Sequence, residues 1–174
     1  MNRDISRFLS SGDIHTQITD KLYENTSSYD IEGLGLIFPI AFDIHLYKVD
    51  QELELALSVE FEYETQCARC TKPLREKVKS QAELRLSENP EMIDEEYEEE
   101  ILFLGSLKIL PIGDLVMSQV ISSRPFKSLC QDDCQGICPQ CGQDLNIKSC
   151  DCTMTSEINP FEELQGLFSD DKEV

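Results

Sequence analysis

Residues 51–66, with the sequence QELELALSVEFEYETQ, alternate between apolar and polar side chains. Alternation with a period of two places successive side chains on opposite faces of a β-strand. One face of this segment is apolar and the other is rich in glutamate, so the segment predicts a strand with one face in the core. The apolar positions are Leu53, Leu55, Leu57, Val59, Phe61 and Tyr63.

The segment before this strand predicts its partner. In residues 36–49, Phe42, Ile44 and Leu46 alternate with mostly polar residues, and a short turn would connect the two segments as a hairpin. Pro39 lies early in the segment. Because proline has no N–H for the sheet ladder, we expect it at an edge of the sheet or at the entry to the strand.

The segment after it, residues 75–86, repeats the alternation with a lysine-rich polar face. Opposite charges on neighbouring strands favour one register, so this face should lie beside the glutamate-rich face of residues 51–66. Between the two segments stands CARCTKPL. The first cysteine pair, Cys67 and Cys70, is therefore predicted at the tip of a hairpin.

Later segments predict a further strand and two short helices. The apolar run of residues 101–110 should return to the sheet. Residues 113–123 predict a helix with Asp114 as its N-cap, which ends before Pro125. The apolar face of this helix carries Leu115, Val116, Val120 and Ile121. A second helix is predicted in residues 159–168.

The net charge changes the choice of partner. The chain has 34 acidic and 15 basic residues, a formal charge of −19, and therefore repels nucleic-acid backbones. Basic ribosomal or other nucleic-acid-binding proteins are the partners that fit this charge. The sequence shows no signal peptide and no run of about 18 apolar residues. We therefore expect a cytoplasmic protein with no membrane partner.

Eight cysteines in a reducing compartment indicate metal ligands rather than four disulfides. Six of them lie between residues 130 and 152, and the sequence CPQCG at residues 138–142 is typical of a zinc knuckle. In such a turn Pro139 fixes the backbone and Gly142 adopts a positive φ, so that backbone N–H groups point at the thiolates.

Eight thiolates supply ligands for two tetrahedral zinc ions. One predicted site consists of Cys138, Cys141, Cys150 and Cys152, and the other of Cys67, Cys70, Cys130 and Cys134. The alternative places the two Cys-x-x-Cys pairs on one ion, as in a zinc ribbon. In either case, at least one site should join the β domain to the C-terminal segment.

Other uses of the thiols fit the sequence less well. A thioredoxin-like redox centre needs its Cys-x-x-Cys at a helix N-terminus, whereas Cys67 and Cys70 lead into another strand. Iron–sulfur clusters usually show a different cysteine spacing, which favours zinc here. Iron is the alternative metal. Catalytic zinc generally recruits histidine or carboxylate ligands. His15 and His45 are far from the cysteines in sequence, and we interpret both as surface residues.

The sequence as a whole predicts an α+β fold that is mainly antiparallel β. We expect a β-sheet or a partly open barrel, with one or two short helices and a zinc-bound C-terminal segment. Two domains are predicted. Residues 1–125 form the mainly β domain, which carries the first cysteine pair and an acidic loop at residues 88–100. Residues 126–174 form a cysteine-rich zinc module with a short C-terminal helix and an acidic tail.

The cysteine motifs and their surroundings resemble the YceD family, which is named for large ribosomal RNA subunit accumulation. The resemblance spans roughly residues 59–164 and includes CARCTKPL, DLVMSQVISSRPFKSLC, CQGICPQCGQDLN and INPFEEL. It implies a role in the synthesis, processing or stability of large-subunit (23S) ribosomal RNA, without catalytic residues. Some family members lack the CPxCG motif but keep the first pair and a thiol equivalent to Cys134, which favours the partition given first.

These observations favour a non-enzymatic ribosome biogenesis factor with two structural zinc ions, whose acidic surface binds a basic ribosomal protein or the nascent large subunit. The alternative is a zinc-ribbon RNA-binding protein that contacts ribosomal RNA directly. Arg124, Lys127 and Lys148 are the basic candidates for that contact. A thiol redox protein or a zinc-dependent enzyme is the third hypothesis.

Overall fold

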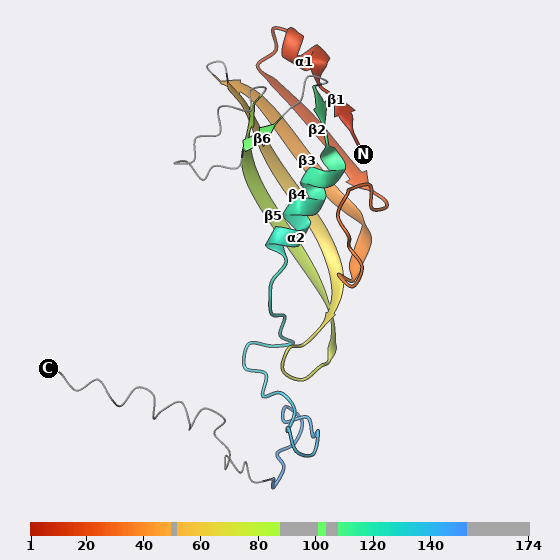
Figure 1. The fold of residues 1–174 in the computed structure, drawn as a ribbon. Helices are drawn as coiled ribbons and strands as arrows, with labels where there is room; N and C mark the ends of the chain where they lie inside the picture. Colours follow the sequence, from red (N-terminus) through yellow and green to blue (C-terminus); the bar gives the residue numbers. More distant parts are fainter. Residues whose placement is uncertain (50–51, 88–100, 104–107, 153–174) are drawn as a thin grey trace, which may run out of the picture.

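The computed structural model describes residues 1–49, 52–87, 101–103 and 108–152, with only the backbone for residues 101–103. Mainly antiparallel strands and two short helices make up this part of the chain, which confirms the predicted fold class (Figure 1). No helix in these ranges is long and apolar enough to cross a membrane. The elements are β1 (Arg3–Asp4), α1 (Ser6–Ser10), β2 (His15–Leu22), β3 (Leu36–Val49), β4 (Glu52–Gln66), β5 (Pro73–Ser87), β6 (Ile101–Phe103), β7 (Ile109–Leu110) and α2 (Ile112–Ser123).

Five strands form one sheet in the order β2-β3-β4-β5-β6. Neighbouring strands from β2 to β5 are antiparallel, and β6 runs parallel to β5. β1 and β7 form a separate two-stranded antiparallel sheet. Within the described residues β2 and β6 are the edges of the larger sheet. The sheet alternative is therefore correct, and no barrel closes there.

One face of the sheet packs under α2 and forms the core (Figure 1). All six apolar positions predicted for β4 are buried. The register places Leu57 of β4 between Ile44 of β3 and Ala82 of β5, so that apolar side chains meet across the strands. Because burial of each large apolar side chain contributes about 1.5–3 kcal/mol, this face drives folding of the sheet. The helix contributes Ile112, Leu115, Val116, Met117 and Val120.

The start of α2 differs from the prediction. Pro111 rather than Asp114 occupies the N-cap, and no side chain caps the helix. Asp114 Oδ1 instead accepts hydrogen bonds from the backbone N–H and the hydroxyl of Ser28, at 2.7 and 2.8 Å. These bonds lower the pKa of Asp114 and hold the β2–β3 connection against the helix. Ile121 is 38% exposed rather than buried, because it lies about 100° around the helix from Val120.

Two strand predictions also need correction. The edge alternative for Pro39 is wrong, because β3 lies between β2 and β4. The alternative at the entry to the strand is correct, since Pro39 is the fourth residue of β3. It lies where the β3–β4 register shifts, between Ile37 and Ala41, and an interrupted ladder tolerates a residue without an N–H. Residues 101–110 return to the larger sheet only through β6, since β7 pairs with β1. The second helix, predicted in residues 159–168, lies outside the described residues.

The face of the sheet opposite α2 is polar, and we call it the open face. The side chains of the open face belong to His15, Gln17, Thr19 and Lys21 of β2, Ala41, Asp43, His45 and Tyr47 of β3, Glu54, Ala56, Ser58, Glu60, Glu62 and Glu64 of β4, and Arg75, Lys77, Lys79, Gln81, Glu83 and Arg85 of β5.

The charge pairing predicted between β4 and β5 is present on the open face. Lys79 Nζ lies 2.8 Å from a carboxylate oxygen of Glu60, which also pairs with Lys77. Arg75 Nη2 lies 2.6 Å from Glu62. The hydrogen bonds from the two lysines lower the pKa of Glu60 to about 2. Because these groups are in contact with solvent, the pairs specify the strand register more than they stabilise the fold.

Substitution of Gly113 tests the packing at the start of α2. A methyl group on its Cα would lie 2.8 Å from both the carbonyl oxygen and the hydroxyl of Thr26. We expect Gly113→Ala to lower the free energy of unfolding in urea by about 1–3 kcal/mol, although alanine normally favours a helix over glycine by about 1 kcal/mol. Gly12→Ala is the matched control, because its methyl group meets no atom within 4 Å. Equal stability of the two variants would contradict this packing.

Candidate metal centres

The first cysteine cluster begins in the turn between β4 and β5. The N–H of Cys67 donates to the carbonyl of Lys72 at 2.8 Å, and the N–H of Thr71 donates to the carbonyl of Cys67 at 2.9 Å. Thr71 has a φ of 59°, which reverses the chain. The turn buries both Cys67 and Cys70. The first pair thus lies at the tip of a hairpin, as the sequence predicted.

The chain after α2 brings two more cysteines to this tip (Figure 1). The N–H of Ala68 donates to the carbonyl of Ser128 at 2.9 Å. Arg69 Nη1 donates to the carbonyl of Cys134 at 2.7 Å. Cys134 is buried beside the hairpin tip, and Cys130 is half-buried. Backbone and side-chain hydrogen bonds therefore position the second half of the cluster.

The sulfur positions of this first cluster suit one tetrahedral ion. Cys67 Sγ lies 3.7 Å from Cys134 Sγ, and Cys70 Sγ lies 3.6 Å from Cys130 Sγ. Zinc–sulfur bonds of about 2.3 Å in a tetrahedron place the sulfurs about 3.8 Å apart. All four sulfurs lie within 4.8 Å of one another. Four thiolates could therefore complete the coordination of one ion.

The second cluster combines the CPQCG turn with the last two cysteines. The N–H of Gly142 donates to the carbonyl of Cys138 at 2.9 Å, and the N–H of Cys138 donates to the carbonyl of Gln143 at 2.8 Å. Gly142 has a φ of 73°, the positive value expected for a zinc knuckle. The sulfurs within 4.8 Å of one another belong to Cys138, Cys141, Cys150 and Cys152.

The eight cysteines are thus grouped as in the first of the two partitions considered from the sequence. The zinc-ribbon grouping, with Cys67 and Cys70 beside Cys138 and Cys141, is not formed. None of the eight cysteines is in a disulfide. The first cluster joins the hairpin of the β domain to the C-terminal segment, whereas the second cluster closes within that segment.

The thiols of each cluster ionise unequally. Burial opposes ionisation of Cys67, but N–H donors at Cys70 and Cys130 outweigh it and lower the pKa of Cys67 to about 6. Burial and the neighbouring sulfurs raise the pKa of Cys130 to about 12. One thiolate therefore forms readily at neutral pH and holds its neighbours in the thiol form. A divalent cation removes this conflict, because it stabilises all four thiolates together.

The second cluster shows the same conflict. The N–H groups of Cys141 and Gln140 lower the pKa of Cys138 to about 6. The neighbouring Cys141 sulfur and burial raise the pKa of Cys152 to about 12. Both clusters thus have the electrostatics expected of four thiols grouped to bind one cation.

Asn146 reaches the first cluster from the loop between Cys141 and Cys150 of the second cluster, and it was not singled out from the sequence. Its Nδ2 donates to Cys134 Sγ at 3.5 Å, and its Oδ1 accepts the N–H of Gln135 at 2.8 Å. The adjacent N–H of Leu145 donates to the carbonyl of Gly136 at 2.9 Å. Donors of this kind orient a ligand and stabilise its charge. The signal in the sequence is the position of Asn146 at the end of CQGICPQCGQDLN.

The basic residues proposed from the sequence for RNA contact lie in or near the segment after α2. The Arg124 guanidinium lies 4.7 Å from the centre of the Tyr63 ring. Lys127 and Lys148 are exposed. Phe126, between Arg124 and Lys127, is fully exposed. The two histidines lie on the open face, outside both clusters, as predicted for surface residues.

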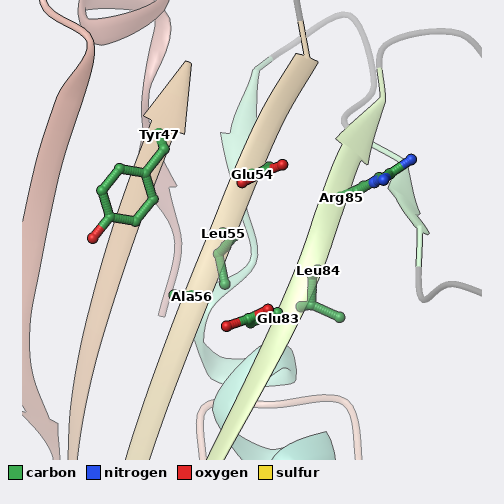
Figure 2. A pocket seen from close by; sticks show the side chains of 7 residues that line it. All are labelled: Tyr47, Glu54, Leu55, Ala56, Glu83, Leu84 and Arg85. Atoms are coloured by element: carbon green, nitrogen blue, oxygen red, sulfur yellow. The ribbon is translucent and has the colours of Figure 1, made fainter. Parts of the chain in front are cut away.

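The open face also carries a shallow hollow of about 360 Å³ over Ala56. Figure 2 shows Tyr47 of β3 on one side of Ala56 and Glu83 of β5 on the other, with Glu54 beside them. Neither Glu54 nor Glu83 forms a salt bridge with a described residue. Leu55, Leu84 and Arg85 complete the lining.

Comparison with known proteins places these features in a family. A family model described as large ribosomal RNA subunit accumulation protein YceD matches residues 55–168, which include all eight cysteines. Uncharacterised proteins of Mycobacterium bovis and of two strains of Mycobacterium tuberculosis are each 30% identical to this chain over 80 residues.

The aligned part covers 46% of this chain and 39% of each of these relatives. The match to this chain thus spans about two fifths of their length. No solved structure matches the chain. The family model, in contrast, covers more than half of the chain and contains both cysteine clusters. The chain therefore belongs to the YceD family of large ribosomal RNA subunit accumulation proteins.

Proposed function

We propose that this protein is a non-enzymatic, cytoplasmic factor in ribosome biogenesis that supports the accumulation of large-subunit (23S) ribosomal RNA. It would act by binding a basic ribosomal protein or an assembly intermediate of the large subunit. The family description supports the link to ribosomal RNA. The observation that carries the mechanism is the pair of four-cysteine clusters, one of which joins the β domain to the C-terminal segment.

Both clusters are assigned structural zinc. Four thiolates complete a tetrahedral shell, whereas catalytic zinc keeps a position for water or substrate. The burial of Cys67, Cys70 and Cys134 supports a structural role in the first cluster. Zinc bound at such sites contributes directly to folding free energy. We therefore assign no catalytic or redox step to the cysteines.

The charge of the chain supports a basic protein as the partner. Two zinc dications do not offset eight thiolate charges, so metal binding makes the chain more negative than −19. In the hollow on the open face, the Tyr47 ring and the carboxylates of Glu54 and Glu83 surround a space for a cationic side chain. Aromatic rings and carboxylates both attract lysine and arginine. This hollow is the proposed contact for a basic residue of the partner.

Direct contact with ribosomal RNA is the second candidate. It is favoured by the full exposure of the Phe126 ring beside Lys127, since an exposed aromatic ring next to a cation can stack on a base while the cation binds phosphate.

The two-zinc assignment makes a prediction about stoichiometry and stability. Native mass spectrometry should find two zinc ions on the wild-type chain and one on either Cys67→Ser or Cys141→Ser. Cys67→Ser should lower the thermal midpoint by about 10 °C or more, because the first cluster joins distant segments. Cys141→Ser is the matched control and should lower the midpoint less, since the second cluster closes locally. Two ions on both variants, or bound iron, would contradict the assignment.

Asn146→Ala tests the side chain that reaches the first cluster. Loss of the donor to Cys134 Sγ should speed zinc release to a chelator about tenfold or more, as for other residues that orient metal ligands. Ile147→Ala is the control, because this neighbouring side chain is 81% exposed. Release is followed with a colorimetric zinc indicator. Identical release rates for the two variants would remove Asn146 from the proposed site.

Affinity capture from cytosol tests the partner. The zinc-loaded chain should retain basic proteins of the large subunit after nuclease treatment. Glu54→Gln combined with Glu83→Gln should reduce that capture at least about fivefold, because two carboxylates of the hollow are neutralised. Glu64→Gln, on the same strand and face but outside the hollow, should have little effect. Capture that disappears with nuclease and is insensitive to the double substitution would favour the RNA-binding alternative.

A further inference from the structure

The two histidines of the chain lie side by side on the open face. The β2–β3 register pairs His15 with Tyr47 and Gln17 with His45, so the two histidines are diagonal neighbours on adjacent strands. His15 Nε2 lies 3.0 Å from His45 Nδ1, and the ring planes differ by 13°. The Tyr47 ring stacks beside His15, with the ring centres 4.8 Å apart.

A fixed carboxylate determines which nitrogen of His45 carries the proton. Asp43 Oδ2 lies 3.3 Å from His45 Nε2. Gln17 Nε2 donates to the two oxygens of Asp43 at 2.9 and 3.0 Å, and Thr19 Oγ1 donates at 2.8 Å. The hydrogen bond from Gln17 is the largest of the causes that lower the pKa of Asp43. The carboxylate is therefore ionised at neutral pH and accepts a hydrogen bond from His45 Nε2–H.

With that proton on Nε2, the lone pair of His45 Nδ1 accepts the hydrogen bond that His15 Nε2–H donates at 3.0 Å. A histidine that donates one ring N–H to a carboxylate and presents its other nitrogen is the usual arrangement of a metal-binding imidazole. The carboxylate fixes the tautomer and the ring orientation before any ion arrives. Asp43, Gln17 and Thr19 thus act as an outer shell around one prepared ligand.

We propose that His15 Nε2 and His45 Nδ1 bind a divalent transition-metal ion on the open face, at a site independent of the two cysteine clusters. Metal–nitrogen bonds of about 2.0–2.1 Å place two neighbouring ligand nitrogens about 2.9 Å apart at right angles and about 3.3 Å apart in a tetrahedron. The observed separation of 3.0 Å lies in this range.

The ion would lie on the solvent side of the line between the two nitrogens. The His45 ring stays where Asp43 holds it. The exposed His15 ring carries its proton on Nδ1 instead of Nε2 and turns about its Cβ–Cγ bond to direct the freed Nε2 lone pair to the ion. Imidazole ligands favour ions such as Ni²⁺, Cu²⁺ and Zn²⁺. Two protein ligands leave coordination positions that face solvent, where water or a side chain of a partner completes the shell.

Titration of the zinc-loaded chain with Ni²⁺ tests this site. Ni²⁺ is the probe because zinc already fills the cysteine clusters and Cu²⁺ oxidises thiols. Isothermal titration calorimetry should show one Ni²⁺ bound per chain without loss of zinc. His15→Gln and His45→Gln should each weaken binding at least about tenfold, because the second imidazole binds at high effective concentration. Asp43→Asn should weaken binding about tenfold through the outer shell.

Gln81→Ala is the control, since its side chain is exposed on the same face two strands away. It should bind Ni²⁺ like the wild type. Equal affinities of the wild type and both histidine variants would overturn the proposal, because they would mean binding by a single imidazole or elsewhere. Release of one zinc ion for each Ni²⁺ bound would also overturn it, since the probe would then occupy a cysteine cluster.

Discussion

The contact between the β4–β5 hairpin tip and the segment after α2 holds the cysteine-rich segment to the sheet. It joins Cys67 to Cys134 across 67 residues and Cys70 to Cys130 across 60 residues. Closing so long a loop costs conformational entropy that grows with the logarithm of its length. The hydrogen bond from Ala68 to Ser128 contributes only about 1 kcal/mol. In the proposed two-zinc protein, an ion held by four thiolates would supply the largest stabilising term at this contact.

The second cluster reaches the β domain through the first. The N–H of Ile137 donates to the carbonyl of Arg69 at 3.3 Å, and Asn146 donates to Cys134 Sγ at 3.5 Å. An ion in the second cluster would therefore support a segment that the first cluster has already placed. The hollow of the open face lies near the start of β4, whereas the first cluster lies at the hairpin tip beyond the end of that strand (Figure 1). Metal sites that hold the fold and a surface that binds a partner can thus occupy separate parts of one chain.

Strand periodicity predicted β3, β4 and β5. One face of each strand packs in the core and the other contacts solvent, so apolar and polar residues alternate along the sequence. The N-terminal elements were not predicted: β2 places only Thr16, Ile18 and Leu22 toward the core, too weak a pattern to stand out. The N-cap role predicted for Asp114 from its local sequence was wrong, because its carboxylate accepts a hydrogen bond from the distant Ser28 instead. The cysteine spacing and the predicted hairpin tip favoured the observed grouping, but the alternative zinc-ribbon grouping could be rejected only from the positions of the sulfur atoms. The contact between His15 and His45 could not be predicted from the sequence, because it depends on the register between β2 and β3.

Zinc K-edge X-ray absorption of the purified protein distinguishes closed structural sites from open ones, because it identifies the ligand atoms without a substitution. Two closed sites require two zinc ions per chain, each with a first shell of four sulfurs at about 2.3 Å and no nitrogen or oxygen ligand. A mixed sulfur and oxygen shell would indicate an open site suited to chemistry. An iron–iron scattering pair would indicate a cluster. Either result would contradict two closed structural sites that hold the C-terminal segment to the sheet.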